Sequence, residues 1–319
     1  MRAAGRFVVE THGHLTTLYK KKGDVDGKWS GLPSAPEDGE VEVFENIPLC
    51  LYDMERYGVD MVLLKPSMPG TTNEFQAGIV EKYPGKFAAF CADQKLRRAC
   101  ARGETVWTVQ AAAEEVEAAL KTGNYIGIGE FTPRDWRREK IYTFKERLEE
   151  MRLFWELARD YEVSIDFHEF TWVYGFDTWQ LLNQLLIDFP GVACVINHGG
   201  YSIGFYVEGE RPIKKALAVA GFPMGKRNVY LETGTWPWEY YRMALEDPNI
   251  GPYQLLWGSD YGHVPQYIVA QPGKQPSSFS TAMKHWPPVP GYQVDWWGWG
   301  LHQIDRLRDY VTQDEINLI

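Results

Sequence analysis

The chain has few cysteines, and none of them pairs in a short motif. A C-x-x-C spacing is absent from its 319 residues, so the sequence argues against a disulfide framework and against a thiolate zinc site. We therefore expect a reduced, cytoplasmic setting. The cysteines are Cys50, Cys91, Cys100 and Cys194.

A long run of basic residues is also missing, as is an apolar stretch of membrane-spanning length. The formal net charge is −10, which argues against nucleic acid as a partner, because phosphate binding needs a basic surface. The absence of a long apolar stretch argues against a membrane partner. A signal peptide is not expected either, because the first predicted strand begins near Arg6 and already carries candidate ligands.

Predicted strands and helices alternate along the whole chain, without a composition break that would mark a linker. The predicted strands are Phe7–His14, Asp60–Lys65, Ala88–Ala92, Ile126–Phe131, Val163–Phe170, Ala193–His198, Val229–Thr233 and Leu255–Asp260. The predicted helices are Thr108–Lys121, Thr143–Tyr161, Asp177–Asp188, Pro212–Ala220 and Trp238–Glu246. Thr143–Tyr161 is the clearest helix, because Thr143 and Glu146 form a capping box before apolar residues at helical spacing.

This alternation predicts an α/β fold, a single (β/α)8 TIM barrel over residues 1–319. A doubly wound open sheet would usually carry a glycine-rich phosphate loop after its first strand, and here His12-Gly13-His14 takes that place.

Two connections are too long to be simple turns. Residues 15–43, after the first strand, are polar, and residues 264–300, after the eighth, are rich in Pro and Trp. Segments of this length are usually lids or binding loops, or else disordered. Trp286, Trp296, Trp297 and Trp299 are too apolar to stay solvated, so we expect the second segment to pack over the barrel mouth or in a subunit interface. Thr312 and Glu315 predict one more capped helix before Ile319, which indicates a truncated chain or a tail beyond it.

Potential metal ligands follow the C-terminal ends of five predicted strands. They are His12, His14, Glu130, His168, His198 and Asp260. In a barrel of parallel strands these ends meet at one mouth. A single histidine at a strand end is more often a packed core or rim residue, Glu130 could cap a helix, and Asp260 could be a turn residue. These alternatives would have to coincide on five strands, so the joint pattern favours a metal site.

Further residues near the strand ends are weaker candidates. Glu10 lies one pleat deeper than His12, and His263 follows Asp260 by three residues, so both could support the ligands. Arg134 could bind an anionic substrate or belong to a solvated loop. Trp172 and Trp236 could form an aromatic wall for a substrate or simply pack.

The predicted ligands suit a divalent transition metal. Imidazole and carboxylate groups bind Zn, Mn or Fe, and six ligands are more than one tetrahedral zinc ion needs. One carboxylate could bridge two ions about 3.5–4 Å apart and thereby lower the pKa of a shared water. Asp260 could then accept the proton of that water and return it to a leaving group.

These motifs resemble the amidohydrolase superfamily. His12-x-His14, His168, His198 and Asp260 occur in the order typical of that superfamily. Phe189-Pro190-Gly191 with Asn197-His198-Gly199-Gly200, and Gly258-Ser259-Asp260-Tyr261-Gly262-His263, resemble signatures of its amidohydrolase-related branch, in which proline usually stands where this chain has Gly262.

The resemblance implies a ligand assignment. His12, His14 and Asp260 are implied to hold one ion, His168 and His198 a second, and Glu130 is implied to link them. The branch contains nonoxidative decarboxylases, hydrolases, hydratases and a few dinuclear oxygenases, and dimers are common in it. Its decarboxylases typically use one ion, lack a carboxylate on strand four, and use the strand-six histidine as a catalytic group. Glu130 departs from that pattern.

The sequence therefore predicts a metal-dependent hydrolase with a dinuclear centre of Zn, or of Mn or Fe, and a small organic substrate that is partly aromatic or carboxylated. Three alternatives stay open. The first is a decarboxylase with one ion, in which His198 handles protons, and the second is an oxygenase with Fe or Mn. The third is a non-catalytic metal-binding subunit that pairs with an active homologue through the tryptophan-rich segment. We also expect a homo- or hetero-oligomer.

Overall fold

A computed structural model of the chain describes most of the sequence in eight stretches. These are residues 7–23, 40–66, 71–131, 143–168, 178–200, 228–234, 236–262 and 296–319.

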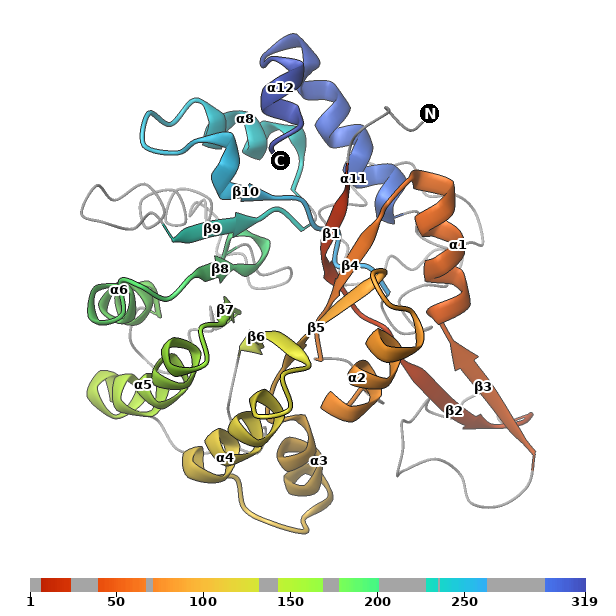
Figure 1. Ribbon diagram of the computed structural model, residues 1–319, viewed down its shortest axis with the longest axis vertical. Coiled ribbons are helices and arrows are strands. Elements are labelled where there is room, and N and C mark those ends of the chain that lie inside the picture. The colour runs from red at the N-terminus through yellow and green to blue at the C-terminus, as the bar shows by residue number, and fades with distance from the viewer. Residues whose placement is uncertain are drawn as a thin grey trace.

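The centre of the fold is an eight-stranded sheet in which all neighbouring strands run parallel. Its strands, in sheet order, are β1 (Val9–Gly13), β4 (Met61–Leu64), β5 (Phe87–Cys91), β6 (Tyr125–Phe131), β7 (Ser164–Phe167), β8 (Cys194–Ile196), β9 (Val229–Glu232) and β10 (Leu255–Leu256). Sheet order equals chain order, which is the topology of a (β/α)8 barrel. Figure 1 shows the strands around a common centre with helices outside them.

The first strand and the segment after the last strand close the barrel. Thr11 donates its backbone N–H to the Trp257 carbonyl at 3.0 Å, and Tyr261 donates to the His12 carbonyl at 3.0 Å. His14 in turn donates to the Tyr261 carbonyl at 2.6 Å. The barrel is therefore closed beside the residues that carry its predicted ligands.

Helices between the strands and after the last strand cover the barrel (Figure 1). They are α1 (Ile47–Tyr57), α2 (Asn73–Lys82), α3 (Gln94–Arg102), α4 (Val109–Leu120), α5 (Phe144–Asp160), α6 (Thr178–Asp188), α8 (Trp238–Leu245), α11 (Trp296–Asp305) and α12 (Gln313–Ile316). The predicted capping box starts α5: Thr143 accepts the Glu146 N–H, and the Glu146 carboxylate accepts the Thr143 N–H. The face of α5 that carries Met151 and Trp155 is buried in the core.

The predicted (β/α)8 architecture is confirmed, with all eight strands and four of the five helices in place. The helix expected at Pro212–Ala220 lies outside the described residues. The last predicted strand, Leu255–Asp260, was too long: regular pairing ends at Leu256, and the chain then crosses to β1.

Parts of the two long connections are ordered elements, contrary to expectation. Residues 15–43 contribute to an antiparallel hairpin of β2 (Thr17–Lys21) and β3 (Val41–Glu45), which extends from the barrel in Figure 1. Helix α11 begins inside the segment expected as loop 264–300. The expectation that Trp297 is covered is confirmed, because only 1% of it is exposed. Trp286 lies outside the described residues.

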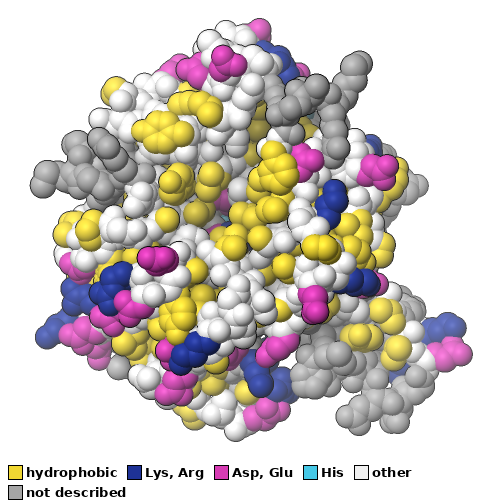
Figure 2. All heavy atoms as spheres, in the orientation of Figure 1, with side chains coloured by type: hydrophobic (Ala, Val, Ile, Leu, Met, Phe, Trp, Pro, Cys, Tyr) yellow, Lys and Arg dark blue, Asp and Glu magenta, His cyan; other side chains and the backbone are white. Residues whose placement is uncertain are grey.

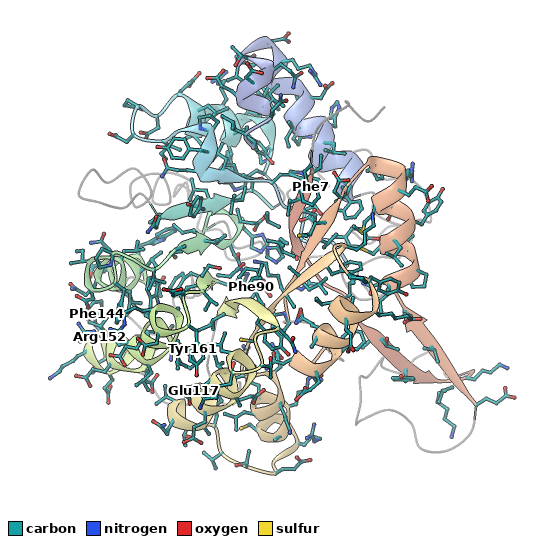
Figure 3. All side chains as sticks on the ribbon, viewed as in Figure 1. Phe7, Phe90, Glu117, Phe144, Arg152 and Tyr161 are labelled. Carbon is teal, nitrogen blue, oxygen red and sulfur yellow. The ribbon has the colours of Figure 1, made fainter. Side chains whose placement is uncertain are left out.

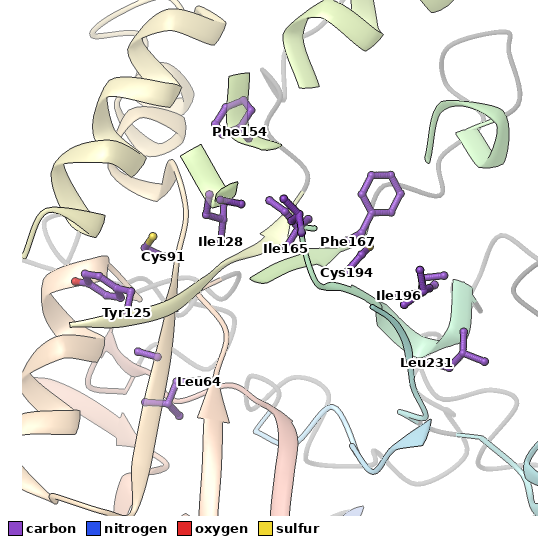
Figure 4. Packing of buried hydrophobic residues seen from close by; sticks show 14 of the residues in the cluster. Leu64, Cys91, Tyr125, Ile128, Phe154, Ile165, Phe167, Cys194, Ile196 and Leu231 are labelled. Atoms are coloured by element: carbon purple, nitrogen blue, oxygen red, sulfur yellow. The ribbon is translucent and has the colours of Figure 1, made fainter. Parts of the chain in front are cut away.

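The hydrophobic core lies between the strands and the helices. Figure 4 shows Ile165, Phe167, Ile196 and Leu231 from neighbouring strands, with Phe154 of α5, in this layer. These strands are buried on both faces, as parallel strands covered by helices usually are.

The surface carries both signs of charge. Figure 2 shows hydrophobic side chains near the centre of one face and charged side chains of both signs mostly toward its periphery. Within the described stretches, none of the helices is long and apolar enough to cross a membrane.

Candidate metal centre

The structure brings all six predicted ligands together at the C-terminal ends of the barrel strands. They are His12 and Glu130 within β1 and β6, His14 and His168 directly after β1 and β7, His198 in the 3-10 turn η2 (Asn197–Gly200) after β8, and Asp260 after β10. Five of the six are buried, and His168 is partly exposed. The mouth of the barrel thus collects nitrogen and oxygen ligands from five strands.

One group of ligands contains His12, His14, Glu130 and Asp260. The Nε2 atoms of His12 and His14 are 3.1 Å apart. Glu130 Oε1 lies 3.2 Å from Nε2 of His12, and Asp260 Oδ1 lies 3.1 Å from Nε2 of His14. These distances place a carboxylate oxygen beside each of the two imidazoles, and His12, His198 and Asp260 form a further triad of ligand atoms within 4.8 Å of one another.

A second group shares Glu130 with the first. Nε2 of His168 lies 3.5 Å from Glu130 Oε1, and ligand atoms of Glu130, His168 and His198 all lie within 4.8 Å of one another. The ring of His198 also stacks on that of His12, with centroids 4.7 Å apart. Glu130 is therefore the carboxylate that belongs to both groups.

The hydrogen bonds of the two β1 histidines show that a cation fits between them. Nδ1 of His12 faces a carboxylate oxygen of Glu232 at 2.9 Å, and Nδ1 of His14 faces the Lys65 carbonyl at 3.1 Å. Because both partners can only accept, each Nδ1 carries the hydrogen, and each neutral ring presents a lone pair at Nε2. Two such lone pairs 3.1 Å apart, with carboxylate oxygens beside them, repel unless a cation lies between them.

Glu232, at the end of β9, is the main residue that the sequence analysis missed. It is fully buried, and its Oε2 accepts both His12 Nδ1–H and the backbone N–H of His198, at 2.9 and 2.8 Å. A carboxylate behind a metal-binding histidine fixes its tautomer and raises its basicity. The signal was available, because Val-Tyr-Leu-Glu ends a predicted apolar strand with an acid.

Without an ion, a proton takes the place of the cation. Burial lowers the pKa of His12, but the nearby carboxylates of Glu232, Glu130 and Asp260 raise it overall to about 10. Burial opposes ionisation of Glu130, but His168, His14 and His12 hold the pKa of that carboxyl well below its usual range. Burial lowers the pKa of His198 to about 4, so this ring is a neutral ligand near pH 7.

A buried ion pair lies beneath the ligands. Lys65 follows β4 and pairs through its ammonium with Asp166 of β7, two residues before His168, and both are buried. The Lys65 ammonium also lies 4.0 Å from the centroid of Phe90, which Figure 3 places near the barrel centre. The sequence analysis missed this pair, although Lys65 and Asp166 lie within predicted strands.

Two of the weaker candidates support the ligands from behind. The β1–β4 register shifts between Glu10 and Gly13, so strict alternation is lost and Glu10 does not point with His12 as expected. Its carboxylate instead binds Ser259 and Trp297. Trp236 is fully buried and donates its indole N–H to the His198 carbonyl at 2.8 Å, so it supports His198 and does not form a substrate wall. Arg134, Trp172 and His263 lie outside the described residues.

The backbone at two ligands is left-handed. His198 has φ 51° and Asp260 has φ 59°, a region that residues other than glycine seldom adopt. At the next residue, Gly199, a Cβ would lie 2.1 Å from the Trp236 ring, so glycine is required there.

Comparisons with known proteins agree with this architecture. A sequence model of the family described as amidohydrolase matches residues 9–281. No curated protein matches the chain. Similar solved structures include an amidohydrolase from Burkholderia multivorans with bound zinc, with a TM-score of 0.53 at 9% identity over 98% of this chain and 96% of that one. A TatD family hydrolase from Entamoeba histolytica gives 0.52 at 12% identity, with the same coverage. At such low identity these structures show a shared fold.

Proposed function

Because the chain belongs to the amidohydrolase family, we propose that it is a metal-dependent hydrolase that acts on a small organic substrate with a pair of divalent ions. The observation that carries the proposal is the convergence of six ligands at the catalytic end of the barrel, where Nδ1 of His12 and of His14 faces an acceptor and the two Nε2 atoms lie 3.1 Å apart among the other ligands. The zinc in the similar Burkholderia multivorans amidohydrolase supports this assignment.

The two ligand groups correspond to two ion positions. His12, His14 and Asp260 would hold the first ion, and His168 and His198 would hold the second. Glu130 lies 3.2 Å from a nitrogen of the first group and 3.5 Å from a nitrogen of the second, so it would be the ligand that the two ions share. Such sharing is typical of dinuclear centres.

The balance of buried charge also favours two ions. One buried ammonium, that of Lys65, lies among five buried carboxylates, those of Glu10, Glu130, Asp166, Glu232 and Asp260. Uncompensated buried charge is unfavourable by several kcal/mol per ion. With neutral histidines, one divalent ion would leave the cluster negative, whereas two ions would balance its charge.

The protein side chains divide the chemical work. A bound pair of divalent ions polarises the scissile carbonyl and makes a water acidic enough to ionise near neutral pH. Asp260 accepts the proton of that water and returns it to the leaving group. Glu232 keeps His12 in the tautomer that presents Nε2, and Lys65 compensates the charge beneath the site. Trp236 and Glu232 together hold the backbone of His198 in place.

Metal content tests the proposal first. Protein purified without chelator should hold about two ions per chain, counted by inductively coupled plasma mass spectrometry, and Glu130→Gln should hold about one. A single ion in the wild-type protein would contradict the dinuclear centre and favour the decarboxylase. Redox-active iron with substrate-dependent oxygen uptake would favour the oxygenase.

Activity tests the reaction. Small esters, lactones and amides should be hydrolysed by the wild-type protein and not by Asp260→Asn. Asparagine tolerates the left-handed backbone at this position, so the variant should fold normally. Turnover of Asp260→Asn near the wild-type rate would contradict the role of this carboxylate. Loaded protein that hydrolyses none of these substrates while binding two ions would favour the non-catalytic subunit.

A further inference from the structure

The carboxylate of Glu10 joins three parts of the chain directly behind the metal ligands. Its Oε1 accepts the backbone N–H groups of His12 and Ser259, both at 2.9 Å. Its Oε2 accepts the Ser259 hydroxyl at 2.6 Å and the indole N–H of Trp297 at 2.7 Å. Glu10 is fully buried, so four protein donors satisfy a charge that water does not reach.

Three of these donors belong to a ligand or to its neighbour. His12 is a ligand on β1, and Ser259 directly precedes Asp260. On the other side of Asp260, Tyr261 exchanges backbone hydrogen bonds with His12 and His14. The left-handed conformation of Asp260 is thus held by hydrogen bonds on both sides.

The fourth donor comes from the C-terminal part of the sequence. Trp297 lies in α11, and its ring stacks on Tyr261 with centroids 4.6 Å apart and packs on Trp257 at 6.4 Å. The backbone N–H of Trp257 also donates to the carbonyl of Ile319 at 3.2 Å. Helix α11 therefore packs against both ends of the 257–261 segment that carries Asp260.

We propose that Glu10, Ser259 and Trp297 form a positioning clamp, through which the docking of α11 sets the geometry of His12 and Asp260 as metal ligands. The proposal rests on the metal centre of the proposed function. Because the clamp residues contact the ligands only from behind, they are positioning residues and not catalytic ones. The indole N–H of Trp297 is the contact that links α11 to Glu10.

The chain offers a matched control for a test of this contact. Trp155 of α5 is as deeply buried as Trp297, but its indole N–H has no hydrogen-bond partner within the described part of the chain. Trp297→Phe and Trp155→Phe therefore remove the same atoms, and only the first removes a donor to Glu10. Glu10→Gln serves as a second variant, because an amide NH2 group cannot accept the donors that one carboxylate oxygen now binds.

Two readouts separate the clamp from general stability. In Co²⁺ titrations of the ion-free full-length protein, Trp297→Phe should weaken binding by about tenfold or more and alter the d–d absorption bands. Glu10→Gln should show a larger loss, and Trp155→Phe should leave both affinity and spectrum close to wild type. In the ion-free proteins, the amides of His12 and Ser259 should exchange hydrogen about tenfold faster in Trp297→Phe than in Trp155→Phe.

Equal effects of the two tryptophan variants on Co²⁺ binding would overturn the proposal. Weaker binding by Trp297→Phe without faster exchange at His12 and Ser259 would also overturn it, because the clamp acts on those two amides. If the wild-type protein takes up no Co²⁺, the proposed function fails, and the exchange rates alone then decide whether the clamp exists.

Discussion

Replacement of Glu232 by glutamine removes the negative charge behind His12 while nearly preserving the side chain's shape. The amide oxygen can still accept from Nδ1 of His12 and from the His198 backbone, so the fold and the tautomer of His12 should persist. What changes is the electrostatic attraction for a positive charge at Nε2 of His12.

The size of that change follows from the geometry. Glu232 Oε2 lies 2.9 Å from Nδ1 of His12, which places Nε2 about 5 Å and a bound ion about 7 Å from that oxygen. With an effective dielectric constant of about 20, the carboxylate attracts a divalent ion by about 5 kcal/mol and a proton on Nε2 by about 3 kcal/mol.

Metal affinity depends on the difference between these two energies at neutral pH. In the ion-free protein, burial lowers the pKa of His12, but the carboxylates, mainly that of Glu232, raise it to about 10. An ion that binds at pH 7 must therefore displace a proton from His12. Glu232→Gln weakens both interactions, so the net loss is about 1–2 kcal/mol, or about tenfold in dissociation constant. The loss of metal affinity should be larger at pH 9 than at pH 7. At pH 9, His12 of the ion-free variant is already neutral, so a lower pKa of His12 no longer offsets the weaker attraction for the ion.

Competition with a chromophoric chelator measures the zinc dissociation constant at both pH values. Glu117→Gln is the control, because Glu117 is an exposed acid that pairs with Lys121 on α4. Zinc binding by Glu232→Gln that is as tight as in the wild-type protein would refute the electrostatic role of Glu232. A loss that shrinks between pH 7 and 9 would refute the competition with a proton on His12.

Three further outcomes are expected. At pH 9, zinc binding should release about one more proton from wild type than from Glu232→Gln, because only wild-type His12 is still protonated. Calorimetry in two buffers of different ionisation enthalpy measures this release, and equal release from the two proteins would contradict the prediction. Lys65→Met should lower the free energy of unfolding by about 3–5 kcal/mol in urea, since it leaves Asp166 unpaired, and Lys65→Met/Asp166→Leu should recover most of the loss; a single variant as stable as wild type would show that the pair is not needed. Thr143→Ala should cost about 1 kcal/mol through the lost cap of α5 without changing zinc affinity, and an unchanged urea midpoint would contradict it.

The barrel could be predicted from the sequence because strand and helix patterns alternate so regularly. Each predicted strand is a short apolar run, and a capping box in the sequence marks the start of α5. The helices α1, α2 and α3 were missed for local reasons. For example, α1 contains a proline in its first turn, and α3 is short and strongly charged. The hairpin of β2 and β3 was not predicted, because it lies in a polar segment whose composition is typical of a loop.

The metal ligands at the strand ends could be predicted from the sequence. The roles of the residues that support these ligands were harder to predict. A histidine after an apolar strand is visible in sequence, and barrel topology then gathers such residues at one mouth. Glu10 was expected to share a face with His12, but the register shift in β1 changes its direction, and nothing local in the sequence marks that irregularity. The sequence places Glu232 and Lys65 near the ends of predicted strands, but their roles depend on partners on distant strands.

The seam of the barrel lies at the metal centre, and this has a consequence for folding. Glu10 and Ser259 meet across 249 positions of sequence, so the seam can form only after nearly every intervening strand has found its place. Closing so long a loop costs conformational entropy, and contacts this distant slow the search for the native state. An ion bound by ligands on both sides of the seam would act as a cross-link between the two ends of the chain, and it would slow the opening of the completed barrel.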